Sequence, residues 1–369
     1  MSSVHAPVFA VSTVLCNRLR PSGPACLLLL TVPWSRGRLP AMKAAITAIA
    51  SHVPERVLPN EELARTVDTS DEWIVSHTGI RERRIAEPHE AASDLGYEAA
   101  RAALGKRNIG PEAVDLIICA TSTPDYLTFP STACMMENRL GCSNAGAFDL
   151  QAGCTGFAYA LESARSAVVS GGARCVLVVG AEVLSKITNW NDRNTCVLLG
   201  DGAGAAVVEP AEGDAGHEIC YSWLRSKGSG GKALIRPAGG TRTPFVDGTH
   251  SATDLTLTMN GKQVYLFAVD AIVQTIGALC ERAGIERTEL DWIVPHQANA
   301  RIIEAAAKRL GLPLERFYLN LDRYANTSAA SIPIALVEME ERGLLTRGQR
   351  VLTVGFGAGL SYGGNLIDW

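Results

Sequence analysis

Short apolar runs bounded by Gly, Asp or Pro alternate along this chain with stretches whose apolar residues recur at helical spacing. This alternation is typical of parallel strands covered by helices. The apolar runs predict strands at residues 44–49, 116–120, 147–150, 175–180, 204–208, 293–295, 317–319, 351–354 and 364–367. The helical patterns predict helices at residues 61–66, 92–104, 131–140, 156–170, 261–283, 300–310 and 328–342. We therefore expect an α/β protein.

Two segments interrupt the alternation. Residues 227–253 are rich in Gly, Pro, Thr and Ser without periodicity, which predicts a long surface loop of the kind that often borders a binding site. Residues 209–216 form an acidic, glycine-containing connector. We expect it to divide the chain into an N-terminal half at 42–212 and a C-terminal half at 213–369.

The two halves share a repeat. In the first, DLIICATS (115–122) leads to QAGCTGFAYAL (151–161) and then VLVVG (176–180). In the second, DWIVPHQAN leads to RYANTSAASIPIAL and then VLTVG. Aligning the runs pairs Cys154 with Asn326 and Ala120 with His296. Reactive side chains at corresponding loops of a duplicated unit predict a catalytic site on a pseudo-dyad.

The composition and charge argue against a membrane-spanning protein and against a general nucleic-acid binder. The 369 residues are 47% hydrophobic and 20% charged, enough for two domains or one duplicated fold. No run of eighteen apolar residues exists, so we expect no membrane span. A formal net charge of -4 argues against a general nucleic-acid binder.

The ten cysteines form no CxxC pair and no zinc-like spacing, which predicts a reduced, cytoplasmic setting and no metal site. Residues 1–41 differ from the rest because they carry arginines but no carboxylate. We interpret them as a disordered leader or an over-extended start. A genuine transit peptide, and hence a plastid location, is the alternative.

Cys154 is the candidate nucleophile. It lies between a predicted strand and a predicted helix, where free N–H groups and the helix dipole stabilise a thiolate, so we expect a lowered pKa. Gly153 and Gly156 would allow a substrate carbonyl to approach closely. The alternative is a buried structural cysteine.

His296 and Asn326 are candidate partners. His296 follows an apolar run, at the carboxyl end of a strand, where open α/β sheets bind ligands. Asn326 precedes a predicted helix and could be a simple N-cap. Together with Cys154, these types suit thioester exchange followed by carbon–carbon bond formation. The thiolate accepts an acyl group, and the imidazole N–H and the amide stabilise an enolate.

From Met42 to Trp369 the chain resembles 3-oxoacyl-(acyl carrier protein) synthase III of the thiolase superfamily. The matching motifs are VDTSDEWIVSHTGIRERR (67–84), QAGCTGF, GDGAGAAV (200–207), VPHQANAR, NTSAAS and GFGAGLSYG (355–363). The resemblance implies a thiolase-like duplicated fold of five αβαβα layers, with two mixed sheets related by a pseudo-dyad. It implies decarboxylative condensation of a short acyl-coenzyme A, expected to be acetyl, with malonyl-acyl carrier protein.

The resemblance also assigns roles at the reacting centre. Cys154 would take the acyl group, while His296 and Asn326 promote decarboxylation. The oxyanion hole would combine the backbone N–H groups of Cys154 and Ala358. Phe356 would shield the site and help expel carbon dioxide. Coenzyme A and acyl carrier protein act as substrates, and no cofactor is implied.

Substrate contacts carry over in the same way. Trp73 and Arg193 would sandwich the adenine of coenzyme A, and Asn299 would hold its pantetheine arm. His77 departs from the family, where Arg is common, so its grip on a phosphate should be weaker. Phe129 lies where relatives insert a side chain into the partner subunit's acyl pocket, which implies a homodimer and a short starter.

A basic helix face completes these expectations. Arg301, Lys308 and Arg309 share one face of a predicted helix, where relatives dock acyl carrier protein. An ordinary solvated face is the alternative. The whole expected contact set is Gln297, Ala298, Asn299, Ala300, Arg301, Lys308 and Arg309.

Three alternative functions can be compared with this one. A synthase or acyltransferase of specialised metabolism would use another starter or acceptor, and residues 227–253, His77 and Phe129 would distinguish it. A non-decarboxylating thiolase is disfavoured because residues 355–363 contain no second cysteine. A noncatalytic thioester-binding scaffold is disfavoured because Cys154, His296 and Asn326 are all present.

Overall fold

The computed structural model describes residues 42–213, 216–246 and 248–369. The interpretation of residues 1–41 as a leader therefore lies outside the described residues, as does part of the predicted connector. Short apolar strands and amphipathic helices alternate along the described chain, as the hydrophobic pattern predicts.

The N-terminal half contributes five strands to a mixed sheet, in the order β5-β4-β6-β7-β1. β4 pairs in parallel with β5 and β6, and β7 runs antiparallel between β6 and β1. The strands are β1 (Ala44–His52), β4 (Leu116–Ala120), β5 (Gly146–Leu150), β6 (Val176–Val183) and β7 (Asp201–Pro210).

The C-terminal half repeats this order with β11-β12-β13-β8. β11 pairs in parallel with β12, and the remaining pairs are antiparallel. The strands are β8 (His217–Ser226), β11 (Trp292–Pro295), β12 (Arg350–Gly357) and β13 (Ser361–Asp368). Phe317 bridges to β11 at the position of the fifth strand, so the predicted strand at 317–319 is wrong and only a single bridge forms.

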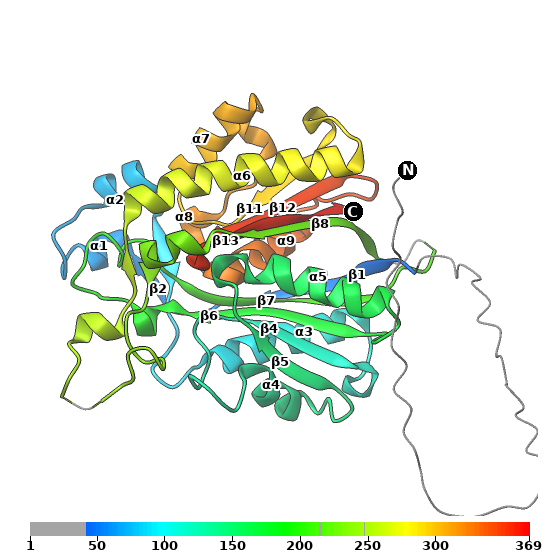
Figure 1. Cartoon of the computed structure of the whole chain (residues 1–369), viewed down its shortest axis with the longest axis horizontal. Helices are drawn as coiled ribbons and strands as arrows, with labels where there is room; N and C mark the ends of the chain where they lie inside the picture. Colours follow the sequence, from blue (N-terminus) through cyan, green and yellow to red (C-terminus); the bar gives the residue numbers. More distant parts are fainter. Residues whose placement is uncertain (1–41, 214–215, 247) are drawn as a thin grey trace, which may run out of the picture. The chain divides into compact units, whose positions relative to one another are not determined.

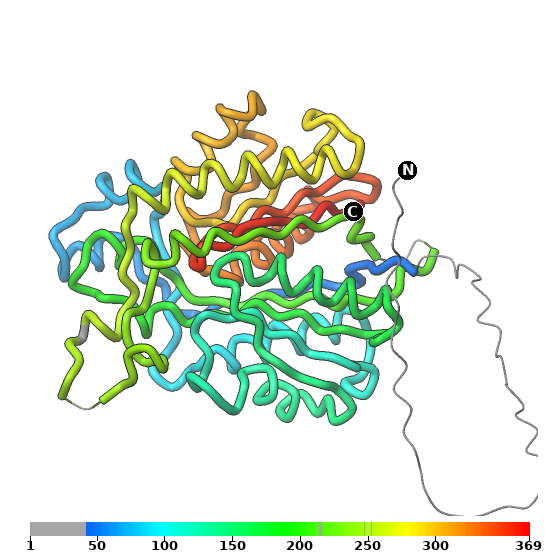
Figure 2. Tube along the Cα trace, viewed as in Figure 1, coloured from blue at the N-terminus to red at the C-terminus, as the bar shows by residue number. Residues whose placement is uncertain are grey.

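The two groups of strands meet at one narrow seam. β1 and β8 pair only through Ala45 with Glu218 and Ile46 with His217. This joins nine of the described strands into one mixed sheet, so the two expected mixed sheets are continuous with each other at the seam. Figure 2 shows the C-terminal strands lying beside β8, which comes from the middle of the sequence.

Helices fill three further layers (Figure 1). α5 (Gly156–Val169) and α9 (Ser331–Glu341) pack between the two groups of strands and contact both. The outer layers are α3 (Ala92–Arg107) with α4 (Thr132–Leu140) on one side and α6 (Gly261–Ala283) with α7 (Ala300–Leu310) on the other. The resulting order is αβαβα, as expected.

α6 is the one helix of the described chain that is long and apolar enough to cross a membrane. Nine of its residues are buried, and it packs against β8, β12 and β13. Its apolar character is therefore explained by the core that it covers.

The ten-residue strand β8 was not predicted. Several short elements were not predicted either, namely β2 (Val57–Pro59), β3 (Glu82–Arg84), β9 (Leu234–Ile235), β10 (Thr258–Met259), α2 (Asp71–Thr78) and α8 (Leu321–Tyr324). The helix predicted at 61–66 is reduced to α1 (Asn60–Leu63). Because β9 pairs with β10, the segment predicted as a loop at 227–253 is anchored to the strand that follows it.

Candidate active site

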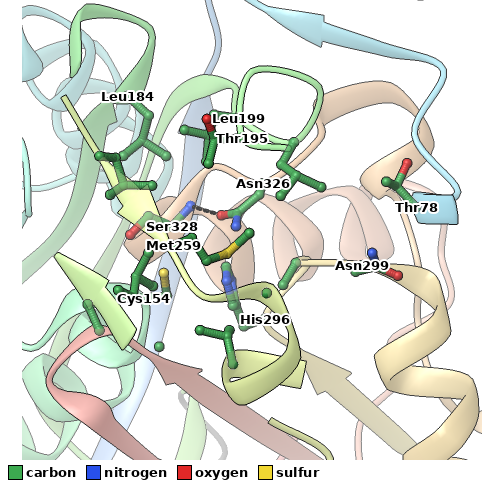
Figure 3. A pocket seen from close by; sticks show the side chains of 18 of the residues that line it. Thr78, Cys154, Leu184, Thr195, Leu199, Met259, His296, Asn299, Asn326 and Ser328 are labelled. Carbon is green, nitrogen blue, oxygen red and sulfur yellow. Dashed lines mark hydrogen bonds between the residues drawn. The ribbon is translucent and has the colours of Figure 1, made fainter. Parts of the chain in front are cut away.

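A cavity of about 270 Å³ opens where loops of the two halves meet. Cys154, His296 and Asn326 all line it, as Figure 3 shows, so the structure brings together the three residues predicted from the repeat. Most of the remaining lining is apolar and includes Leu184, Ile187, Leu198, Leu234, Leu257, Met259, Val264 and Phe356.

Cys154 sits in a tight turn, Gly153–Thr155, directly before α5. Gly153 has a φ of 56°, and a Cβ there would lie 2.9 Å from the carbonyl oxygen of Ala358, so glycine is required. Gly357 on β12 approaches from the other half, where a Cβ would lie 3.0 Å from the Cys154 Sγ. Backbone from both halves therefore encloses the thiol.

The electrostatics of Cys154 correct one prediction. Burial raises the pKa of the Cys154 thiol to about 11, and the Glu182 carboxylate acts in the same direction. The Ser328 hydroxyl and the N–H groups of Ala358 and Cys154 lower the pKa, but by less. The predicted lowered pKa is wrong because the loss of water outweighs the hydrogen bonds that stabilise the thiolate.

The same two N–H groups matter for the chemistry. The backbone N–H groups of Cys154 and Ala358 both interact with the thiol sulfur. Donors placed there lie close to the position that the oxygen of an attacked carbonyl would occupy. The arrangement can stabilise a tetrahedral oxyanion formed on Cys154.

His296 is buried, with 1% of its surface exposed. Its backbone N–H donates to the carbonyl oxygen of Val354 at 2.7 Å, and its Nδ1 lies 2.7 Å from the Ser331 Oγ. Phe356 packs edge-on against the imidazole, with ring centres 5.1 Å apart. Burial lowers the pKa of His296 to about 3, so the imidazole is neutral at physiological pH.

Asn326 is oriented by its own turn. Its Oδ1 accepts a hydrogen bond from the Ser328 N–H at 2.9 Å, which Figure 3 marks. This bond leaves the amide nitrogen as the free end of the side chain. The bond closes a local turn, but Asn326 is not an N-cap, because Thr327 precedes the helical turn Ser328–Ala330 and Ala330 precedes α9. The N-cap alternative is therefore wrong, and the Asn326 side chain lines the cavity.

Aromatic and basic side chains gather at one end of the cavity. The His77 ring stacks on Trp73 with centres 4.3 Å apart, and the Arg193 guanidinium lies 4.4 Å from the centre of the Trp73 ring. Asn299 donates to the carbonyl oxygen of His77 at 3.0 Å and accepts from the Arg301 N–H at 2.9 Å. Asn299 thus joins α2 to the start of α7 while lining the cavity.

Other predicted residues lie away from the cavity. Phe129 is 80% exposed on the surface of the chain. Arg301, Lys308 and Arg309 are exposed on α7, and Arg309 forms an ion pair with Asp270.

Gln297 does not reach the surface at all. It is 1% exposed, its amide donates to the carbonyl oxygens of Pro295 and Tyr318, and its Oε1 accepts from the Asn320 N–H. Its side chain is therefore fully engaged inside the fold and cannot belong to a docking surface.

Three polar residues at the site were not predicted from the sequence. Ser328 interacts with Cys154, Ser331 contacts His296, and Glu182 is a buried carboxylate that accepts from the N–H of Ser122 at 3.0 Å. Burial raises the pKa of Glu182. A glutamate inside the apolar run of β6 was the available signal. No group of three or more His, Cys, Asp or Glu in the described residues could hold a metal ion.

Comparisons with known proteins identify the family of the chain. Residues 148–228 match the family described as 3-Oxoacyl-[acyl-carrier-protein (ACP)] synthase III, and residues 280–369 match its C-terminal region. The Beta-ketoacyl-[acyl-carrier-protein] synthase III of Caldanaerobacter subterraneus is 51% identical over 326 residues, covering 88% of this chain and 98% of the relative. The protein of the same name from Clostridium acetobutylicum is 47% identical, with 88% and 98% covered.

Solved structures give the same result. The synthase III of Thermus thermophilus superposes with a TM-score of 0.81 at 46% identity, covering 88% of this chain and 99% of that one. The enzyme of Aquifex aeolicus gives a TM-score of 0.80 at 41% identity, with 88% and 100% covered. These similarities confirm the expected thiolase-like fold, and the chain belongs to the 3-oxoacyl-(acyl carrier protein) synthase III family.

Proposed function

We propose that this protein is the initiating condensing enzyme of fatty acid synthesis, which joins a short acyl-coenzyme A, expected to be acetyl-coenzyme A, to malonyl-acyl carrier protein. The observation that carries the proposal is the meeting of Cys154, His296 and Asn326 in one apolar cavity, with two N–H groups at the thiol. The alternative in specialised metabolism is not favoured, because relatives 45–51% identical carry the name synthase III.

In the first half-reaction, the Cys154 thiolate attacks the thioester carbonyl of the acyl-coenzyme A. The N–H groups of Cys154 and Ala358 stabilise the oxyanion. The new carbon–sulfur bond to Cys154 forms, the bond to coenzyme A breaks, and coenzyme A leaves as a thiolate that takes up a proton. The acyl group is then held on Cys154.

In the second half-reaction, malonyl-acyl carrier protein loses carbon dioxide. The electron pair of the broken bond passes into an enolate, whose oxygen accepts hydrogen bonds from His296 and the Asn326 amide. Phe356 is placed to keep water from this step, because it packs against the imidazole. The enolate carbon attacks the acyl group, and collapse of the adduct releases the Cys154 thiolate and the 3-oxoacyl product.

Substrate contacts are assigned on the same basis. Trp73 and Arg193 would hold the adenine of coenzyme A between them after Arg193 moves away from the Trp73 ring, on which its guanidinium lies at 4.4 Å. Asn299 would hold the pantetheine arm that leads to Cys154. Arg301 and Lys308 form the exposed basic face of α7 and would meet acyl carrier protein. The chemistry needs no cofactor beyond these substrates, and we place the protein in the cytoplasm.

We further propose a homodimer. β5 lies at the end of the strand order, so one of its edges has no partner among the described strands. Phe148 on β5 is 43% exposed, and Phe129, on the loop between β4 and α4, is 80% exposed. An unpaired edge that carries an exposed aromatic side chain favours pairing with a second copy of the chain.

The function is tested by intact-protein mass spectrometry after incubation with a panel of acyl-coenzyme A thioesters. Wild type should gain the mass of one acyl group, with acetyl preferred, and Cys154→Ala should gain none. The His296→Ala and Asn326→Ala variants should still acylate but decarboxylate malonyl-acyl carrier protein about 100-fold more slowly. An adduct that survives in Cys154→Ala would disprove the mechanism, and equal loss of both half-reactions would disprove the division of roles.

A further inference from the structure

Ser331, the first residue of α9, holds the buried side of the His296 ring. It is 2% exposed, and its Oγ lies 2.7 Å from His296 Nδ1 and 2.9 Å from the carbonyl oxygen of Ser328. The backbone N–H of Gln297 donates to the same oxygen at 3.4 Å. Among the described residues, Ser331 is the only hydrogen-bond partner of the imidazole ring.

The Ser331 hydroxyl has one proton, so it can donate a hydrogen bond either to His296 Nδ1 or to the Ser328 carbonyl oxygen. If it goes to the Ser328 carbonyl, His296 Nδ1 must carry the ring proton and donate to Oγ, which leaves Nε2 with a bare lone pair. If it goes to Nδ1, the ring proton lies on Nε2. The acceptor to which the Ser331 hydroxyl donates therefore determines the tautomer of His296.

The choice matters because the buried imidazole is neutral and carries only one ring proton. An enolate oxygen in the cavity needs a donor, whereas a bare Nε2 would present a lone pair to a negative charge. We therefore infer that Ser331 is a positioning residue that donates to Nδ1 of His296 and holds the ring proton on Nε2 for malonyl decarboxylation. This inference rests on the proposed function of the site.

Removing the hydroxyl should abolish the preference for the Nε2–H tautomer. In Ser331→Ala, Nδ1 loses the donor that engages its lone pair. Nothing then holds the ring proton on Nε2, and the tautomer with the proton on Nδ1 becomes populated. We expect malonyl decarboxylation to slow by about 10- to 100-fold, less than the roughly 100- to 1000-fold seen when one oxyanion donor is removed outright. Acylation of Cys154 should change by less than about threefold, because its oxyanion donors are backbone groups.

The experiment compares three variants with wild type. Ser331→Ala removes the hydroxyl, and Ser331→Thr restores one and should recover decarboxylation. Ser163→Ala is the matched control, because Ser163 is a half-buried helix serine whose hydroxyl donates to the carbonyl oxygen of Tyr159 at 2.9 Å, away from the cavity. Acylation is followed by mass and decarboxylation by carbon dioxide release.

The tautomer itself is read from ¹⁵N NMR of histidine-labelled protein, with the His296 signals identified by their loss in His296→Ala. Wild type should show the Nε2–H tautomer and Ser331→Ala a shift toward Nδ1–H. A wild-type ring protonated on Nδ1 would overturn the inference even if the alanine variant fails to fold. Unchanged decarboxylation in a folded Ser331→Ala would do so too. Failure of the proposed function looks different, because wild type would then form no acyl adduct on Cys154.

Discussion

Cys154, the proposed nucleophile, lies where ionisation of its thiol is unfavourable. The position of the cysteine before a helix could be read from the sequence, but its burial depends on β12 and on Ser328 in the turn before α9, which come from the other half of the chain. The meeting of Cys154, His296 and Asn326 could be predicted from the alignment of the two repeats. The contact between Ser331 and His296 could not. A hydroxyl's partner is set by tertiary packing, and its neighbours in sequence do not reveal it.

The raised pKa predicts how the thiol reacts with an alkylating reagent. Because only the thiolate is nucleophilic, the rate at Cys154 should climb about tenfold per pH unit from pH 7 to 10 and level off only near the pKa of about 11. The rate is measured with iodoacetamide by mass spectrometry. Cys154→Ala supplies the background from the exposed Cys134. A plateau near pH 7 would instead mean that the helix dipole dominates.

At the scale of elements, helices with clear end signals were predicted best. α6 and α7 have the predicted bounds because Asn260 and Asn299 cap their first turns and Gly284 and Gly311 end them in the left-handed conformation. β8 was missed because HEICYSWLRS mixes charged and apolar residues and is only partly buried. Such a strand shows neither the alternation nor the apolar run on which strand prediction depends.

Two glycines in α3 should respond oppositely to alanine. Gly105 is exposed, and a Cβ added there would meet nothing within 4 Å, so Gly105→Ala should raise the free energy of unfolding by about 0.5–1 kcal/mol through helix propensity. At Gly96 a Cβ would lie 2.6 Å from the Met136 Sδ and 3.3 Å from the Ala181 Cβ, so Gly96→Ala should lower it. Urea unfolding at equal protein concentration measures both, and changes of the same sign would contradict the packing.

At the scale of the whole molecule, the repeated strand order accounts for the placement of the site. Corresponding strands β4 and β11 end at corresponding loops, and α5 and α9 pack between the two groups of strands. This much followed from the repeat in sequence. The narrow seam between β1 and β8 did not, because two pairs of residues leave no pattern that a sequence can show.

The proposed homodimer makes a prediction at this scale. Wild type should sediment at twice the mass of the chain, and Phe148→Glu should shift it toward the monomer by placing a charge at the exposed edge of β5. Leu266→Glu on α6, another exposed apolar residue, should leave the mass unchanged. Analytical ultracentrifugation distinguishes these outcomes, and a monomeric wild type would exclude the proposed interface.

The close approach of β12 to the turn that carries Cys154 limits which related proteins can be joined into a functional chimera. A Cβ at Gly355 would lie 2.8 Å from the Thr155 Cα, and one at Gly357 would lie 2.8 Å from the Cys154 Cβ. A crossover between the proposed halves, near residue 212, would take the turn from one parent and these glycines from the other. Functional chimeras are therefore expected only where the parent that supplies the C-terminal half has glycine at both positions.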